Sequence, residues 1–396
     1  MKKMKIIIAP DSFKGSLSSI EVADIIEREI KKILPEARIK KFPLADGGEG
    51  TVKALVNATQ GRIISCYAKD PLGRKIKSFF GILGNKKTAV IEMASASGLP
   101  LLSLKERDPL LTTTYGTGEL IKGALNQGCR KIIIGIGGSA TVDGGAGMAQ
   151  ALGARLLDKN GENLPFGGGN LGKLAKIDLS LFDKRIKKTK IIIASDVTNP
   201  LCGKNGAAKV YGPQKGATPA MVETLEKNLF HYARIIKNDL GKEVLNLPGA
   251  GAAGGLGAGL CAFLDVKMEK GVELILKAIK FEKHLKNTDF VITGEGKIDA
   301  QVKYGKTILG VAKLARKHKI PVIALCGTLT DEAYELHRYG ISVLESIISS
   351  PMSLEEVMRG NKELLKKKAG ELIRLILVSM SLRGRRPWQS LTSLKR

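Results

Sequence analysis

Residues 5–35 have the sequence KIIIAPDSFKGSLSSIEVADIIEREIKKILP, which predicts a strand followed by a helix. The apolar run Lys5–Ala9 is typical of a buried strand. Ser18 and Glu21 have the spacing of a capping box, and the apolar residues that follow them recur at helical intervals until Pro35. A strand that leads directly into an amphipathic helix indicates an α/β fold.

The same alternation occurs at both ends of the chain and is interrupted in the middle. Residues 39–44 and 51–58 predict a second strand and helix, and residues 290–293, 308–318 and 321–326 predict a strand, a helix and a strand. Between them, residues 63–69, 76–83 and 88–93 are strand-like with turn signals and no helix, which predicts an antiparallel meander.

We therefore expect an α/β protein whose Rossmann-like parallel-sheet domain is built from both chain ends, with a second α/β domain inserted. The expected boundaries are residues 1–61 and 288–377 for the first domain and 62–287 for the insert. Residues 378–396 form a basic tail without apolar periodicity, which we expect to be disordered.

Composition limits the possible partners and location. The 64 Lys and Arg residues against 38 Asp and Glu give a formal net charge of +26, which favours anionic partners. The five cysteines are far apart and form no Cys-x-x-Cys, and the apolar run near the N-terminus is too short for a signal peptide. No apolar span approaches the length needed to cross a bilayer, so we expect a cytoplasmic protein without a membrane partner.

Each of six predicted strands is followed by a loop rich in Gly, Asp, Ser and Thr. These loops are residues 11–16, 45–50, 137–145, 195–203, 293–301 and 326–331. In parallel sheets such loops share the carboxyl edge, where ligands bind. Gly-rich loops before helices favour phosphate, and nearby acids suit Mg²⁺ that is held jointly with phosphate oxygens. Only four histidines occur, all in Lys- and Glu-rich helical context, so acid–base chemistry would fall to carboxylates.

Two other function classes remain open on these residues alone. Gly135-x-Gly137-x-x-Ala140 follows a strand and resembles a dinucleotide fingerprint, as does Gly249-x-Gly251-x-x-Gly254, which would suit an NAD-linked 2-hydroxyacid oxidoreductase. That alternative lacks a histidine acid in any of the loops. A nucleic-acid-binding protein would suit the charge of +26, but only 5% of residues are aromatic and no base-reading motif occurs.

Ten longer motifs occur in order between about Met4 and about Leu377. They are DSFKGS at Asp11, PLADGGEGT at Pro43, DPLGR at Asp70, EMASASGL at Glu92, TTYGTGELI at Thr113, GGSATVDGGAGM at Gly137, SDVTNPLCG at Ser195, GPQKGA at Gly212, GAGAAGGLG at Gly249 and TGEGKID at Thr293. Together they resemble the bacterial glycerate kinase family, the type without a Walker A loop.

The resemblance implies ATP-dependent phosphorylation of D-glycerate. We expect a monomer or homodimer with no nucleic-acid partner, although the sequence does not decide the oligomeric state. The resemblance also implies two α/β domains, one of them Rossmann-like and built from both chain ends, with the active site in the cleft between them. The expected product is a phosphoglycerate, with 2-phosphoglycerate favoured over 3-phosphoglycerate; the sequence leaves the choice between C2 and C3 open.

The loops supply the candidate residues for this chemistry, in which positioning and charge neutralisation carry the reaction. The candidate catalytic residues are Asp46, Lys14 and Asp196. The candidates for binding substrate or phosphate are Ser12, Gly47, Gly48, Gly137, Gly138, Ser139, Thr141 and Asn199. The candidates for Mg²⁺ are Glu49, Glu295 and Asp299, although the sequence does not decide which carboxylate is the base and which binds metal.

Asp46 is the carboxylate most favoured for catalysis, because Gly47 and Gly48 follow it at once and leave it uncrowded at the loop tip. We expect Asp46→Asn to retain the melting temperature while kcat falls by orders of magnitude, since a positioned acid–base group typically contributes ~10²–10⁴-fold. Steady-state kinetics and thermal unfolding measure both effects. A variant that keeps more than about a tenth of the wild-type kcat would reject the role.

Overall fold

The computed structural model describes residues 3–45, 47–299 and 307–382. The chain divides into two compact units, one comprising Met1–Ala45 and Ile275–Arg396 and the other Asp46–Leu274. The boundaries thus lie earlier than the residues 61/62 and 287/288 that the sequence suggested, and the second lies inside helix α9 (Gly271–Ala278).

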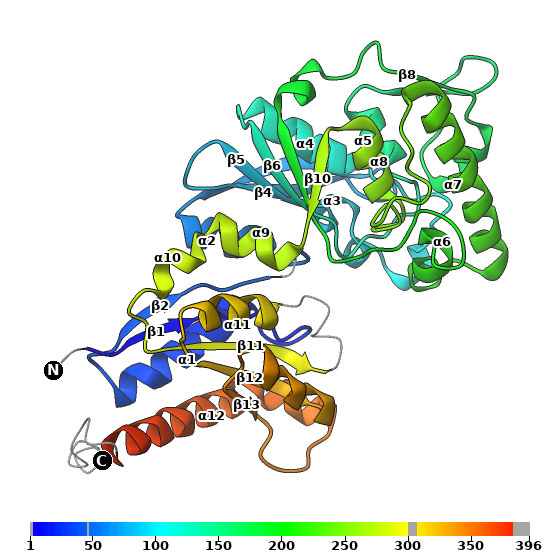
Figure 1. The fold of residues 1–396 in the computed structure, drawn as a ribbon. Coiled ribbons are helices and arrows are strands. Elements are labelled where there is room, and N and C mark those ends of the chain that lie inside the picture. The colour runs from blue at the N-terminus through cyan, green and yellow to red at the C-terminus, as the bar shows by residue number, and fades with distance from the viewer. Residues whose placement is uncertain (1–2, 46, 300–306, 383–396) are drawn as a thin grey trace. The chain divides into compact units, whose positions relative to one another are not determined.

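The first unit contains a five-stranded parallel sheet drawn from both ends of the chain (Figure 1). Its strands are β1 (Lys5–Ile8), β2 (Arg38–Lys41), β11 (Phe290–Ile298), β12 (Val322–Leu329) and β13 (Val343–Ser346), in the order β13-β12-β11-β1-β2. β1 pairs with β2 on one side and with β11 on the other. The strand order therefore reverses between β1 and β11, which is the switch point where open α/β sheets bind ligands.

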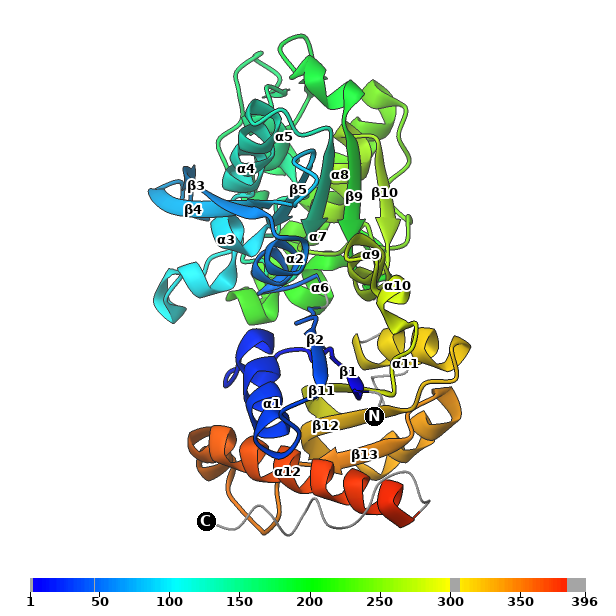
Figure 2. The same cartoon turned by 90° about the vertical axis from the view of Figure 1, so that its left-hand side faces the viewer.

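Helices cover both faces of this sheet (Figure 2). On one face, α1 (Ser19–Ile33) and α12 (Leu354–Leu382) pack against each other and bury apolar side chains with Ile6 and Ile8 of β1. α11 (Thr307–Lys317) lies on the opposite face, and α10 (Phe281–Leu285) precedes β11. The capping box of Ser18 and Glu21 is present at the start of α1, as predicted.

β11 and β12 are longer than predicted, and this corrects two of the expected loops. Residues 293–298 and 326–329 are strand, because Thr293, Gly294 and Glu295 pair with Ala324, Leu325 and Cys326. A Cβ on Gly294 would overlap the carbonyl oxygen of Leu325. Glycine therefore marks close approach of two strands here, although in the sequence it suggested a turn.

The second unit contains a six-stranded mixed sheet in the order β10-β9-β6-β5-β4-β3. β3 (Arg62–Lys69), β4 (Lys75–Ile82) and β5 (Thr88–Glu92) form the predicted antiparallel meander, which is confirmed. β6 (Lys131–Gly135), β9 (Lys190–Ala194) and β10 (Val266–Glu269) continue the sheet from β5 as parallel strands. Their carboxyl ends share one edge with that of β5.

Helix α2 (Thr51–Thr59) belongs to this second unit, and not to the first domain as the sequence suggested. It packs on β3, β4 and β5, and a Cβ on Gly81 of β4 would come within 2.5 Å of Val56 Cγ2. The helix buries Val52, Leu55 and Val56 completely or nearly so. Because that apolar face is covered by the meander, the boundary precedes α2.

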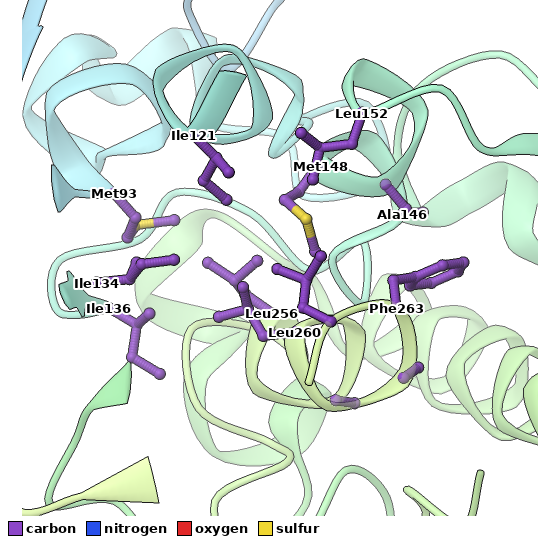
Figure 3. Packing of buried hydrophobic residues seen from close by; sticks show 14 of the residues in the cluster. Met93, Ile121, Ile134, Ile136, Ala146, Met148, Leu152, Leu256, Leu260 and Phe263 are labelled. Atoms are coloured by element: carbon purple, nitrogen blue, oxygen red, sulfur yellow. The ribbon is translucent and has the colours of Figure 1, made fainter. Parts of the chain in front are cut away.

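The core of the second unit lies between its sheet and several short helices (Figure 3). Ile121 of α4 (Tyr115–Asn126), Met148 of α5 (Ala146–Ala151) and Leu260 of α8 (Leu256–Phe263) point into one cluster. The remaining elements are α3 (Ala94–Ser97), α6 (Ala207–Tyr211), α7 (Pro219–Leu240), β7 (Arg155–Leu157) and β8 (Lys176–Asp178). Among the described residues, no helix combines the length and the apolar character needed to cross a membrane.

Helix α12 corrects the expected start of the tail. The sequence suggested disorder from residue 378, whereas the helix continues through Leu382. Ile373 and Leu377 are buried in the core of the first unit, so the last part of the helix before the tail is anchored by apolar packing. Residues 383–396 lie outside the described residues.

We expect removal of Arg383–Arg396 to leave activity and melting temperature unchanged, because this segment has no periodic apolar face. The matched control is removal of residues 372–396, which also deletes the buried Leu372, Ile373 and Leu377. That control should unfold or lose soluble expression, since each lost core side chain costs ~2–5 kcal/mol. Loss of soluble expression in the shorter truncation would contradict the prediction.

Candidate functional site

At the switch point of the first unit, the loop after β1 runs beside β11. Ala9 N donates to Ile292 O at 2.7 Å, and Asp11 N donates to Gly294 O at 2.8 Å. Asp11 is buried, and its Oδ2 accepts a hydrogen bond from Thr307 Oγ1 at the start of α11. Sequence reasoning did not select Asp11, although it is the first residue of the DSFKGS motif.

A tight turn after Asp11 presents Lys14 to solvent. Phe13 and Leu17 pair as an antiparallel bridge, so Lys14 and Gly15 stand at its tip, where Gly15 has a φ of +77°. Lys14 is exposed and Ser12 is half-buried. Asn361 of α12 steadies the turn, because its Nδ2 donates to Ser16 Oγ at 2.8 Å. The lysine therefore extends from an ordered turn at the carboxyl edge of the sheet.

The same edge carries the two acids of the TGEGKID motif. A Cβ on Gly296 would lie 3.2 Å from Lys14 N, so the turn rests against β11 next to Glu295. Glu295 is 8% exposed, and Asp299 follows the end of β11 with Oδ2 3.3 Å from Lys297 Nζ. The first unit thus gathers four of the predicted site residues: Ser12, Lys14, Glu295 and Asp299.

In the second unit, the ADGGEG loop packs against the ends of β6 and β9. A Cβ on Gly135 would overlap Gly47 O, and one on Gly137 would lie 3.1 Å from Gly48 Cα. Gly47 has a φ of +94°, and its own Cβ would lie 3.1 Å from Ala194 O. These contacts leave space only for glycine. They bring Gly47 and Gly48 beside the GGSAT loop (Gly137–Thr141), and the exposed Glu49 follows them in the chain. Asp46 lies outside the described residues.

The GGSAT loop offers a row of backbone donors. Gly138 has a φ of +75°, and the loop is held by Leu99 N donating to Gly138 O and by Ala140 N donating to Ser97 O. The N–H groups of Gly137, Gly138 and Ser139 have no acceptor among the described residues. Successive free N–H groups around a left-handed glycine form a concavity suited to an anion.

Two neighbouring helix N-termini are already occupied by buried carboxylates, which differs from the expectation that they would face phosphate. Glu92 Oε1 accepts from Val52 N of α2 at 2.6 Å. Asp143 accepts from Gly145 N and Gly147 N at the start of α5, and from Thr114 N and its hydroxyl. Burial raises the pKa of both carboxyls. Among the loops before α2 and α5, the row at Gly137–Ser139 therefore remains the better anion site.

Asp196, Asn199 and Thr141 have different surroundings within the second unit. Asp196 is exposed just after β9, two residues beyond Ala194. The Asn199 side chain accepts from Tyr211 OH and donates to Asn205 O, both at 2.9 Å, so it ties loop segments together. Thr141 is fully buried. Its carbonyl, and the hydroxyl of Ser139, accept hydrogen bonds from Lys215, a residue that sequence reasoning did not select.

The Mg²⁺ candidates are split between the units. Glu49 belongs to the second unit, and Glu295 and Asp299 belong to the first. No group of three or more metal-ligating side chains occurs within residues 3–45, 47–299 and 307–382. In phosphoryl-transfer enzymes one or two carboxylates usually share Mg²⁺ with phosphate oxygens, so a group of three protein ligands is not required.

Comparison with known proteins identifies the family. The model of the glycerate kinase family matches residues 6–377. The chain belongs to this family. It is 52% identical to a glycerate kinase of Halalkalibacterium halodurans over 92% of this chain and 96% of that protein. It is also 52% identical to the glycerate 2-kinase of Escherichia coli, over 90% of this chain and 94% of that protein. Membership in the family makes the chain a kinase.

A solved structure shows the same fold. The crystal structure of a Salmonella typhimurium LT2 protein assigned as glycerate kinase 2 matches with a TM-score of 0.85 and 48% identity. The match covers 96% of this chain and all of that one. The α/β architecture predicted from the sequence is thereby confirmed.

The geometry also explains why the dinucleotide fingerprint misleads. After Gly135 the chain does not enter a helix; Ser139 pairs with Gly98 in an isolated bridge, and α5 begins only at Ala146. A dinucleotide site needs the glycine turn to open directly onto a helix N-terminus. The second fingerprint, Gly249–Gly254, leads into α8 but follows no strand.

The buried Glu92 carboxyl generates a pH-dependent prediction. Because its pKa is higher in the folded state than in the unfolded state, it stabilises the fold at low pH and loses that contribution as pH rises through the raised value. Glu92→Gln keeps an oxygen for Val52 N but does not ionise. We expect the urea unfolding midpoint of the variant to rise relative to that of the wild type between about pH 5 and about pH 8.

The exposed Glu162→Gln is the matched control, since it removes the same charge from a solvated site. The difference in urea midpoint between this control and the wild type should not change over this pH range. Parallel midpoint curves for Glu92→Gln and the wild type would show that the Glu92 carboxyl does not titrate differently on folding.

Proposed function

We propose that this chain transfers the terminal phosphoryl group of ATP to D-glycerate, and that the hydroxyl at C2 receives it. The observation that carries the proposal is the match to the Escherichia coli glycerate 2-kinase, which spans nearly the whole length of both proteins at 52% identity. At that identity over nearly the whole length of both proteins, we expect the reaction and its position to be retained.

Glycerate presents a carboxylate and two hydroxyls, so its recognition requires a cation and hydrogen-bond groups. Lys14 supplies a cation on an ordered turn, and Ser12 lies two residues before it. We assign these two residues to the substrate carboxylate or to a phosphate. An ammonium acts as a flexible point charge, which suits an anion that changes position as the reaction proceeds.

We assign the phosphates of ATP to the free N–H groups of Gly137, Gly138 and Ser139, with Gly47 and Gly48 shaping the wall beside them. Mg²⁺ would be held by Glu295 and Asp299, or by Glu49, together with phosphate oxygens. When bound, the ion would neutralise charge on the transferring group. Protein groups need only orient the reactants, because phosphoryl transfer requires little covalent chemistry.

The proton of the attacking hydroxyl needs an acceptor. Asp46 and Asp196 are the two candidates in the second unit, and Asp196 is solvent-exposed after β9. We favour Asp46 because it precedes Gly47, which packs on Ala194 and on the end of β6. Asn199 and Thr141 hold the surrounding loops through their hydrogen bonds, and we assign them a supporting role.

We also place the enzyme in the cytoplasm, as a monomer or homodimer. All five cysteines are free thiols, which suits a reducing compartment. The nucleic-acid alternative rests on net charge alone, and family membership supports small anionic substrates as the partners that this charge attracts.

Proton-coupled ³¹P NMR of the reaction product tests the proposal. We expect D-glycerate and MgATP to give a phosphomonoester doublet, because the phosphate at C2 couples to one proton. A triplet would show transfer to the C3 methylene oxygen instead. L-glycerate is the control and should react more slowly. Absence of any phosphomonoester from D-glycerate would reject the proposed function itself.

A further inference from the structure

Lys215 is a lysine buried almost completely in the second unit. It ends the 3-10 turn η5 (Pro213–Lys215) in the GPQKGA motif, and it is 2% exposed. The next residue, Gly216, has a φ of +92°, and a Cβ there would overlap Arg107 O. The backbone around Lys215 is therefore pinned, and its side chain is held inside the protein. Burial of an ammonium is costly unless hydrogen bonds and opposite charge offset it.

The ammonium group contacts the GGSAT loop directly. Lys215 Nζ donates to Ser139 Oγ at 2.6 Å and to Thr141 O at 2.8 Å. An ammonium has three N–H donors, so these two bonds leave one for another acceptor. Because the Ser139 oxygen accepts from Lys215, its own hydroxyl proton is directed elsewhere. The contact thus holds the Ser139 hydroxyl in place and turns its proton away from Lys215.

The charge of Lys215 is not cancelled by a direct ion pair with any of the described residues. The buried acid that attracts it is Asp143, whose oxygens already accept from Thr114, Gly145 and Gly147. Burial lowers the pKa of Lys215 to about 7, and Asp143 opposes that shift. A nearby anion would stabilise the ammonium form further.

The loop that Lys215 contacts also carries donors that favour a negative group. The N–H groups of Gly137, Gly138 and Ser139 lack acceptors among the described residues, and the Ser139 hydroxyl follows them in the loop. We infer that Lys215 is a positioning residue, which holds Ser139 and the Gly137–Thr141 loop in the conformation that binds a nucleotide phosphate and lends that loop positive charge. This inference rests on the proposed function, because it takes the phosphates of ATP as the anion.

Lys215 could be purely structural, or it could position the loop for a nucleotide phosphate. A purely structural lysine would not favour one ligand over another, so direct binding measurements with two ligands separate these roles. Calorimetric titration of Lys215→Met with ADP and with D-glycerate needs no turnover. We expect at least a tenfold weaker affinity for ADP and a change of less than about twofold for D-glycerate, since only the phosphate loop loses its support. Equal losses for both ligands would overturn the inference.

Lys209→Met is the matched control, because Lys209 is exposed on α6 and its replacement removes the same charge. Its affinity for ADP should stay within about twofold of the wild type. An effect as large as that of Lys215→Met would show that net charge, and not the buried contact, controls nucleotide binding.

Ser139→Ala keeps the inference testable if Lys215→Met does not fold, because it removes one hydroxyl without leaving an apolar side chain beside Thr141 O. We expect Ser139→Ala to weaken ADP binding at least fivefold. The double variant should lose less ADP-binding free energy than the sum of the losses in the two single variants, because Lys215 acts through Ser139. Unchanged ADP affinity in Ser139→Ala would overturn the inference. Failure of the wild type to phosphorylate D-glycerate while it still binds ADP would instead reject the proposed function.

Discussion

The parallel pairing of β1 with β11 is the contact on which the first unit depends. It joins Ile6 to Phe290 and so places segments from the two chain ends in one sheet. Through this pairing the DSFKGS turn lies against Gly296, beside Glu295, and the strand order reverses between the two strands. Apolar packing of α1 and α12 against the same strands stabilises the pairing. The turn that carries Lys14 and the strand that carries Glu295 lie side by side at the edge that this arrangement creates.

Close backbone contact organises the second unit in a similar way. Gly47 and Gly48 pack on Gly135, Gly137 and Ala194 at distances that exclude a side chain. The loop that contains Gly47 and Gly48 thereby packs directly against the ends of β6 and β9. Close packing of this kind transmits small displacements, so the geometry at the GGSAT loop depends on glycines in a distant part of the sequence.

Buried acids and a buried lysine have different roles in the second unit. Glu92 and Asp143 satisfy helix N-termini from inside the fold, whereas Lys215 supports the loop whose N–H groups remain free. The carboxylates are thus used to stabilise helices, and the positive groups are left where an anion can meet them. This division suits an enzyme that binds phosphates, because an uncompensated acid in the same place would repel them.

The sequence by itself determined the α/β class, the meander, the capped first helix and the family, because periodicity, capping residues and long ordered motifs are local properties of the chain. Only the tertiary structure decided that α2 packs on the meander, that Gly294 lies within a strand and that Lys215 is buried beneath Ser139. A glycine reads alike in a turn and in a tight strand contact. A lysine likewise gives no sign in the sequence of whether water or a folded loop will surround it, because burial is fixed by residues far away along the chain.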